Sequence, residues 1–425
     1  MTRLRSNKDF VRLFFGRIVT NAGDSMYFIA SMWLVYTMTG SPFYTGLAGF
    51  LIRIPQGMGF LAGPLVDRWA LRSVLVKTQL IQGLCVLIIP AAAYFDVLSV
   101  WIILIVMPIL SFLNQLVYPA QAAALPRIVS DDQLVRANSM FGVSLRGIDM
   151  TFNALGGILV ATIGAVSIFI IDSITFFLAT LIFMGLSISN PNAKEDGDDA
   201  SEEETGTEEA VEEKGRVEEY LEQLKGGFWY LKGSVLPKMI AGGLIVNFVF
   251  GGLIAVLPAF ADTYTGASAY GFLMAAASAG TVLGALGASA IDDYPFGKIV
   301  IAGYAASAVF WFAALSFPGI VAASFFFFLA FIPIGVVNVV VPSMVQSVVE
   351  DEYMARVMSI VSSAGIVALP IGSLIGGAVG SWVGVGAVMM SMVFALAFLS
   401  LYFLIHPQLR VLPAVGDADK KALGL

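Results

Sequence analysis

The apolar residues of this chain are gathered into long runs, and about 20 such residues are what a helix needs to cross a membrane. Hydrophobic residues occupy 58% of the 425 positions and charged residues only 12%, whereas soluble domains are roughly a quarter charged. The runs and their breakers predict twelve membrane spans, near 13–37, 43–66, 73–94, 98–120, 138–163, 165–188, 237–261, 268–291, 297–316, 319–342, 354–380 and 383–405. We therefore predict an all-α integral membrane protein with short loops.

Basic residues in the connections between these runs are segregated. The connections 39–42, 95–96 and 317–318 contain no Lys or Arg, whereas alternate connections carry them, for example Arg72 and Arg356. Loops rich in Lys and Arg stay in the cytoplasm. We therefore expect a multi-pass protein of the cell membrane with both termini in the cytoplasm.

One segment between the two halves is strongly acidic. Residues 194–225 contain 14 of the 30 acidic and 4 of the 23 basic side chains, so this segment carries a charge of −10 and the rest of the chain +3, which together give the formal charge of −7. It has too few apolar residues to offset the entropy of ordering, and it reads as a solvated spacer or as a regulatory, partner-binding segment. The predicted units are an N-terminal six-helix bundle (1–190), a disordered acidic cytoplasmic linker (191–216), an interfacial amphipathic helix (217–236), a C-terminal six-helix bundle (237–410) and a cytoplasmic tail (411–425).

The connection after the second run carries a motif. Residues 63–72 read Gly-Pro-Leu-Val-Asp-Arg-Trp-Ala-Leu-Arg, a glycine followed four residues later by an Asp-Arg pair and then by another basic residue. This resembles the signature of the major facilitator superfamily, which implies twelve transmembrane helices in two six-helix repeats and transport by alternating access. By the same resemblance Gly63, Asp67, Arg68 and Arg72 form a gating loop, with Asp67 against a helix N-terminus of the other half.

Shorter motifs resemble the drug-efflux branch of that superfamily, which includes macrolide and siderophore exporters. They are Gly23-Asp24, Trp33-Leu34-Val35-Tyr36, Arg53-Ile54-Pro55-Gln56 and Pro119-Ala120-Gln121. This resemblance implies an exporter. The run 98–120 lacks the Arg that antiporters of the superfamily often carry there, which counts against proton antiport.

Two ionisable residues lie at similar depth in consecutive predicted spans. At 1.5 Å per residue, Asp24 lies ~18 Å from the cytoplasmic start of the first span near Arg12, and Arg53 lies ~21 Å from the cytoplasmic end of the second span at Asp67. A charge near the bilayer centre costs at least ~2.5–3.5 kcal/mol on insertion scales. Either Asp24 is a protonatable coupling group in a central cavity, restrained by Arg53, or the two residues form a structural ion pair.

Other polar and small residues are also candidates. Arg146 and Asp149 are expected to neutralise one another on one helix face, with Arg17 as a competing partner, and Asp172 is expected only ~10 Å from the outer end of its span. Further residues could line a cavity or bridge helices, among them Asn21, Gln56, Asn114, Asn247 and Asn338. Small residues expected at helix contacts are Gly156, Gly157, Gly372, Gly376 and Gly377.

Several chemistries are excluded by composition. The single Cys and single His rule out a disulfide framework and a histidine metal cluster, and no G-x-x-x-x-G-K-[ST] motif is present for ATP. We expect that the protein is not an enzyme and binds no cofactor. We expect a monomeric secondary transporter that exports amphipathic organic compounds in exchange for H⁺. Its expected surroundings are membrane lipid, and no nucleic-acid partner is expected. Two alternative functions remain open. One is an importer or lipid translocator on the same fold, and the other is a non-transporting receptor or scaffold that uses the linker.

Overall fold

The computed structural model describes residues 2–57, 69–188 and 234–418, and these residues form helices and connecting segments without strands. Each predicted span contains a helix. In the first half these are α2 (Lys8–Thr39), α3 (Pro42–Gly57), α5 (Leu71–Tyr94), α6 (Val100–Ile128), α7 (Asp131–Ile163) and α8 (Ala165–Met184). In the second half they are α10 (Leu236–Asp262), α11 (Ala267–Gly287), α12 (Phe296–Ser316), α13 (Ile320–Val348), α14 (Asp351–Trp382) and α15 (Val385–Ile405). Eight helices of the described chain are long and apolar enough to cross a membrane.

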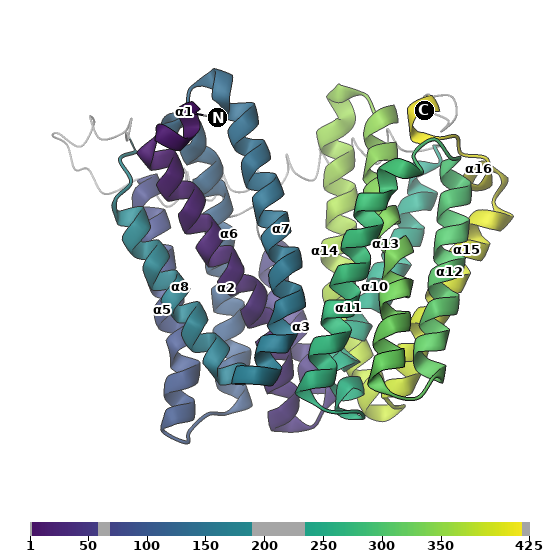
Figure 1. The fold of residues 1–425 in the computed structure, drawn as a ribbon, viewed down its shortest axis with the longest axis horizontal. Coiled ribbons are helices and arrows are strands. Elements are labelled where there is room, and N and C mark those ends of the chain that lie inside the picture. The colour runs from purple at the N-terminus through teal and green to yellow at the C-terminus, as the bar shows by residue number, and fades with distance from the viewer. Residues whose placement is uncertain (1, 58–68, 189–233, 419–425) are drawn as a thin grey trace, which may run out of the picture.

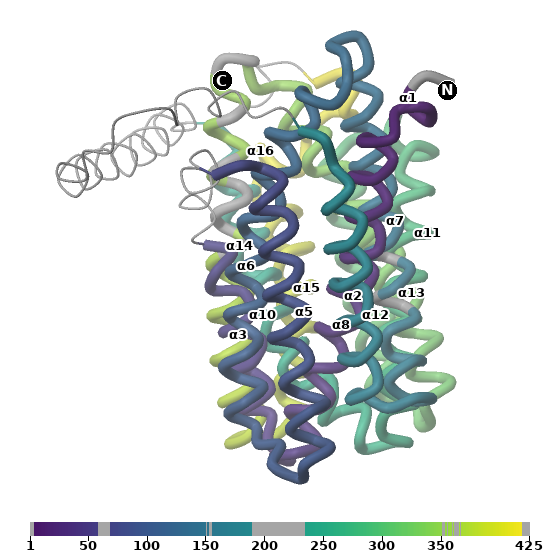
Figure 2. Tube along the Cα trace, turned by 90° about the vertical axis from the view of Figure 1, so that its left-hand side faces the viewer, coloured from purple at the N-terminus to yellow at the C-terminus, as the bar shows by residue number. Residues whose placement is uncertain are grey.

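The helices form two bundles that stand side by side (Figure 1). In the first bundle α8 packs on α2 and α5, and in the second α13 packs on α11 and α12. The short helices α1 (Thr2–Ser6) and α16 (Pro407–Arg410) lie at the same end of the molecule, which we call the termini end. The opposite end is called the far end. Seen from the side, the long helices share one general direction (Figure 2), as expected for a membrane-spanning protein.

The boundary between α7 and α8 is a single residue. Gly164 has φ +81°, a backbone conformation that side-chain-bearing residues rarely adopt. Its N–H still donates to the Val160 carbonyl, and α8 begins at Ala165. The predicted break at Gly164 is therefore confirmed.

Several helices extend beyond the apolar runs that predicted them. α6 continues to Ile128, and α7 begins at Asp131. Asp131 and Asp132 occupy the first turn of α7, where the helix dipole favours negative charge. The length of an apolar run reflects the thickness of the membrane, so the run does not include the polar helical turns that project beyond the membrane.

Buried apolar residues form three clusters. One lies in the first bundle around Leu13, Phe141 and Phe183, and one lies in the second around Phe296 and Phe403. The third and largest cluster contains residues of both bundles. The two halves are thus joined by a shared apolar contact as well as by the chain itself.

The segment after α16 is packed rather than free. Leu412 is buried, and the Phe296 amide donates to the Pro413 carbonyl at 2.9 Å. The part of the predicted tail that the structure describes therefore covers the start of α12. The predicted linker (191–216) and all but the end of the predicted interfacial helix (217–236) lie outside the described residues.

Candidate functional site

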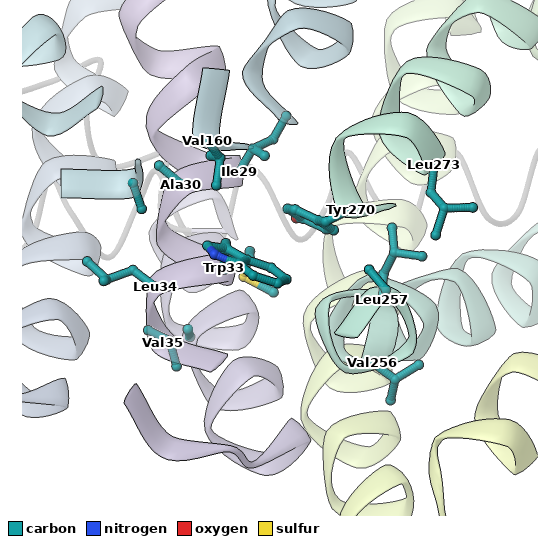
Figure 3. Packing of buried hydrophobic residues seen from close by; sticks show 14 of the residues in the cluster. Ile29, Ala30, Trp33, Leu34, Val35, Val160, Val256, Leu257, Tyr270 and Leu273 are labelled. Carbon is teal, nitrogen blue, oxygen red and sulfur yellow. The ribbon is translucent and has the colours of Figure 1, made fainter. Parts of the chain in front are cut away.

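The two bundles meet through an aromatic pair close to the far end. The rings of Trp33 on α2 and Tyr270 on α11 stack, with centroids 5.6 Å apart and planes at 22° (Figure 3). Both side chains are buried, at 9% and 2% exposure. Their contact lies within the large apolar cluster that both bundles share.

Glycines allow the backbones to touch at the same level. A Cβ atom on Gly157 of α7 would lie 2.4 Å from the Gly271 Cα of α11, closer than real atoms approach. A Cβ atom on Gly377 of α14 would lie 2.9 Å from the Gly46 Cα of α3. Side chains at these positions would therefore hold the bundles apart.

Hydrogen bonds between the bundles occur at this end as well. The Tyr36 hydroxyl donates to Asp262 at 3.2 Å, and the Phe43 amide donates to the Ser381 hydroxyl at 2.9 Å. The Ser373 hydroxyl donates to the Gly46 carbonyl at 3.2 Å. These contacts close the far end, whereas the ribbons of the two bundles diverge toward the termini end (Figure 1).

Two adjoining cavities lie on the termini side of this closure. One has a volume of about 290 Å³ and the other about 390 Å³. Phe28, Arg53 and Asp149 line both cavities, so the two form a continuous site between the bundles.

The smaller cavity is apolar and belongs mainly to the second bundle. Its walls include Phe250 and Leu253 of α10, Met274 of α11, and Phe327 and Phe331 of α13. Tyr270 also lines it, so the far-end closure forms part of its wall. Aromatic and thioether groups of this kind suit flat or irregular apolar ligands.

The larger cavity is polar and belongs to the first bundle. Asp24 lies on its wall and accepts a hydrogen bond from the Asn114 amide of α6 at 3.0 Å. The other carboxylate oxygen, Oδ1, is buried and has no hydrogen-bond partner among the described residues. A buried carboxylate oxygen without a partner costs free energy when it is charged.

Asp149 is held by α2 rather than by its own helix. It accepts from the Asn21 amide at 2.7 Å and from the Ser25 hydroxyl at 2.8 Å. The expected Asp149–Arg146 pair is wrong, because the carboxylate points toward α2 while Arg146 is exposed on another face of α7. The hydrogen bonds replace the ion pair as the source of stabilisation.

Arg53 and Asp24 share the polar cavity but form no ion pair. The Arg53 guanidinium lies over the Phe28 ring, 5.3 Å from its centroid, a cation–π arrangement. Asp24 is turned to Asn114 instead. The structural-ion-pair interpretation is therefore wrong, because equal depth along two helices does not make their side chains face each other.

Arg17 is the buried cation of the first bundle. It is 5% exposed, and its Nε donates to the Gln121 side chain at 2.8 Å. Gln121 belongs to the Pro119-Ala120-Gln121 motif, which is explained here by its contact with Arg17. The expected competition of Arg17 for Asp149 has no counterpart in a described hydrogen bond or ion pair.

The remaining predicted residues divide between the cavity and other places. Gln56 lines the polar cavity, whereas Asn247 donates to the Gly243 carbonyl of its own helix and Asn338 is exposed. Neither Asn is among the residues that line the two cavities. Gly63, Asp67 and Arg68 of the predicted gating loop lie outside the described residues. Arg72 is described, and it donates to the Met184 carbonyl at the end of α8.

The predicted small residues lie at helix contacts. A Cβ atom on Gly156 would meet Ile29, one on Gly372 would meet the Phe248 carbonyl, and one on Gly376 would meet Gly252. The contacts of Gly372 and Gly376 are within the second bundle. Those of Gly157 and Gly377 join the two bundles.

Sequence reasoning missed several residues of the site. Phe28, Phe250 and Phe331 line the cavities. The chain has 32 Phe residues, and nothing in the sequence distinguishes those that line a cavity from those that face lipid. Asn114, which was expected to line a cavity or to bridge helices, does both, since it lines the polar cavity and donates to Asp24.

Comparisons with known proteins decide the family. The sequence profile described as Major Facilitator Superfamily matches residues 13–288, more than half of the chain. The chain belongs to this superfamily. It is therefore a membrane transporter of the MFS type rather than an enzyme.

Relatives and solved structures agree with this assignment. Two Bacillus subtilis proteins named as MFS-type transporters, YfiS and YvqJ, are each 24% identical to this chain and cover 90% of it, at 89% and 88% of their own lengths. The fold is similar to a bacterial homologue of the human lysosomal transporter Spinster, solved in an inward-facing and occupied conformation (TM-score 0.68, 14% identity, 95% and 97% of the two chains). It is equally similar to the peptide transporter POT (TM-score 0.68, 13% identity, 95% of each chain). At these identities the structures establish the fold alone.

Proposed function

We propose that this MFS transporter exports amphipathic organic compounds from the cytoplasm in exchange for protons. The observation that carries the proposal is the composition of the continuous site between the bundles. Its polar part lies in the first bundle and its apolar part in the second, with Arg53 and Asp149 at their junction. A ligand with one polar and one apolar portion satisfies both walls.

The distribution of Lys and Arg supports the direction of transport. It favours cytoplasmic termini, and the cavities lie on the termini side of the far-end closure. In this orientation the structure corresponds to an inward-facing state that loads substrate from the cytoplasm. Rocking of one bundle against the other around the fixed site would then open the far end.

The environment of Asp24 supports proton coupling. It combines a cavity wall, through which a proton can arrive, with a buried oxygen that lacks a partner. Burial of that oxygen favours the neutral carboxyl group, whereas the Asn114 hydrogen bond and Arg53 on the same cavity wall favour the charged one, so the group is suited to binding and releasing a proton. Loss of the proton and arrival of substrate are thus linked events in the proposed cycle, and Asp67 of the gating loop is proposed to bias the same transition.

Transport into inverted membrane vesicles tests this proposal. Ethidium serves as an amphipathic aromatic cation, and its accumulation is measured with the vesicle lumen acidified, with a Na⁺ gradient, and with no gradient. We expect accumulation that follows the pH gradient alone. Phe250→Ala should raise the half-saturating ethidium concentration several-fold, whereas Phe272→Ala should not, because Phe272 is exposed on the neighbouring helix.

Other outcomes separate the rival functions. Uptake of an anionic or sugar substrate from the far side would indicate an importer, and movement of a fluorescent phospholipid would indicate a lipid translocator. Failure of every substrate class in vesicles that contain folded protein would favour a receptor or scaffold. Any of these results would contradict the export proposal.

A further inference from the structure

Two side chains of opposite charge lie where the two cavities meet. Arg53 of α3 and Asp149 of α7 each line both cavities. They form no ion pair with each other, because Arg12 and Asp9 make the one ion pair among the described residues. The junction of the cavities thus presents a cation and an anion to a ligand at the same time.

Asp149 uses one of its two carboxylate oxygens for contacts with the protein. Oδ1 accepts hydrogen bonds from the Asn21 amide at 2.7 Å and from the Ser25 hydroxyl at 2.8 Å. Oδ2 accepts no hydrogen bond from a described residue, and it is not one of the buried oxygens that lack a partner. The carboxylate is therefore held in place by one oxygen, while the cavity reaches the other oxygen.

The Arg53 guanidinium keeps its N–H groups available. Its Cζ atom lies over the Phe28 ring, 5.3 Å from the ring centroid. A cation–π contact attracts the charge but does not satisfy the five N–H donors of the group. None of these donors reaches an acceptor among the described residues, so they remain for an acceptor on a ligand.

One turn of α2 sets the spacing of the two charges. Ser25 holds Asp149. Phe28, three residues later on the same helix, lies against Arg53. Side chains three residues apart share a helix face and are separated by about 4.5 Å along the axis. The two charges therefore lie on one side of α2, about one turn apart, where a single head group can contact both.

The apolar cavity begins at the same junction. Phe250, Phe327 and Phe331 form part of its wall, so a ligand whose head lies at the junction places its tail among aromatic rings. A charge in a membrane-embedded site is costly unless it has a partner. A head group of one sign would compensate one of the two protein charges and leave the other without a partner.

We propose that the preferred substrates are amphipathic zwitterions, which carry an ammonium group and a carboxylate close together on an aromatic or apolar body. The ammonium group donates to Asp149 Oδ2, and Arg53 donates to the carboxylate. Such a head group brings no net charge into the site. The inference rests on the proposed export function and names its substrate class, whereas a cation such as ethidium compensates Asp149 alone.

Three dansyl compounds that differ only in the charges of the head group test this inference. Nε-dansyl-lysine carries both charges, dansylcadaverine is the same molecule without the carboxylate, and dansyl-ε-aminocaproate is the same molecule without the ammonium group. Equilibrium binding to the full-length protein in uncharged detergent micelles is measured at neutral pH from dansyl fluorescence, with the signal of empty micelles subtracted. We expect dansyl-lysine to bind about 10-fold or more tightly than either control compound, because each control lacks one charged hydrogen bond.

Two variants assign the charges to the protein. Arg53→Gln should reduce the affinity for dansyl-lysine to that for dansylcadaverine, whereas Arg53→Lys keeps the charge and should retain a preference. Asp149→Asn should reduce the affinity for dansyl-lysine to that for dansyl-ε-aminocaproate, and it tests the other charge independently if Arg53→Gln fails to fold. Arg146→Gln and Asp96→Asn are the matched controls, because both residues are exposed and line neither cavity.

The results distinguish this inference from the export proposal. Equal binding of the three compounds, or no binding by protein that still binds ethidium, would overturn the zwitterion preference and leave export of cations in place. A preference for dansyl-lysine that survives in both Arg53→Gln and Asp149→Asn would also overturn it. Because binding is measured without a membrane gradient, selective binding of dansyl-lysine by a protein that exports nothing would contradict the export proposal alone.

Discussion

The Trp33 ring of α2 stacks on the Tyr270 ring of α11, with 5.6 Å between centroids, and this pair joins the two bundles on the far-end side of the cavities. Such pairs contribute ~0.5–1.5 kcal/mol beyond the apolar area that they bury. Because the partners belong to different bundles, opening of the far end must separate them. The stacking therefore stabilises the closed far end relative to the open one.

Trp33→Ala should shift the two-state equilibrium toward an open far end. From the stacking energy alone the ratio changes by about 2- to 13-fold. Spin labels at Val97→Cys and Ser316→Cys, in a Cys85→Ser background, report the distance between the bundles at this end. Trp382→Ala is the control, because Trp382 is 85% exposed and should change nothing. An unchanged distance distribution in Trp33→Ala would remove the pair from the closure.

Gly157→Ala should also prevent full closure, by steric overlap with the Gly271 backbone. We expect the same pair of spin labels to report a longer distance, together with slower transport. Gly147→Ala lies on the same helix, and a Cβ atom there meets nothing within 4 Å. Equal behaviour of the two variants would show that the backbones of α7 and α11 do not need to touch.

Gly372→Ala should lower stability without favouring either conformation. Its Cβ atom would overlap the Phe248 carbonyl within the second bundle, and overpacking typically costs ~1–3 kcal/mol. The thermal unfolding midpoint of the purified protein measures this effect. Gly365→Ala, on the same helix with open space around it, is expected to match the wild type, and a stable Gly372→Ala protein would refute the packing argument.

The helices could be predicted from the sequence because membrane thickness imposes a length on apolar runs. The break at Gly164 followed from the excessive length of residues 138–188. The pairing of Arg53 could not be predicted, since a sequence gives depth along a helix but not the direction in which a side chain points. For Asp172, the count along α8 gave the distance from the start of the helix, seven residues after Ala165, but not the packing partner. Its contact with Gly23 depends on how α2 and α8 cross.

The orientation in the membrane is tested by the accessibility of single cysteines. In a Cys85→Ser background, Val97→Cys should react with an impermeant thiol reagent added outside intact cells, because residue 97 is exposed at the far end. Ser130→Cys, exposed at the start of α7, should react only after the membrane is permeabilised. The reverse pattern would place the termini outside and reverse the direction of transport.

Asp24 is proposed to couple proton movement to export. The most direct test of this role compares wild type and Asp24→Asn in inverted vesicles, for ethidium accumulation driven by a pH gradient and for exchange of ethidium between equal concentrations. Asp24→Asn keeps the shape of the side chain, so we expect exchange to continue while uphill accumulation is lost. If Asp24→Asn still concentrates ethidium in response to the pH gradient, Asp24 is not the coupling residue.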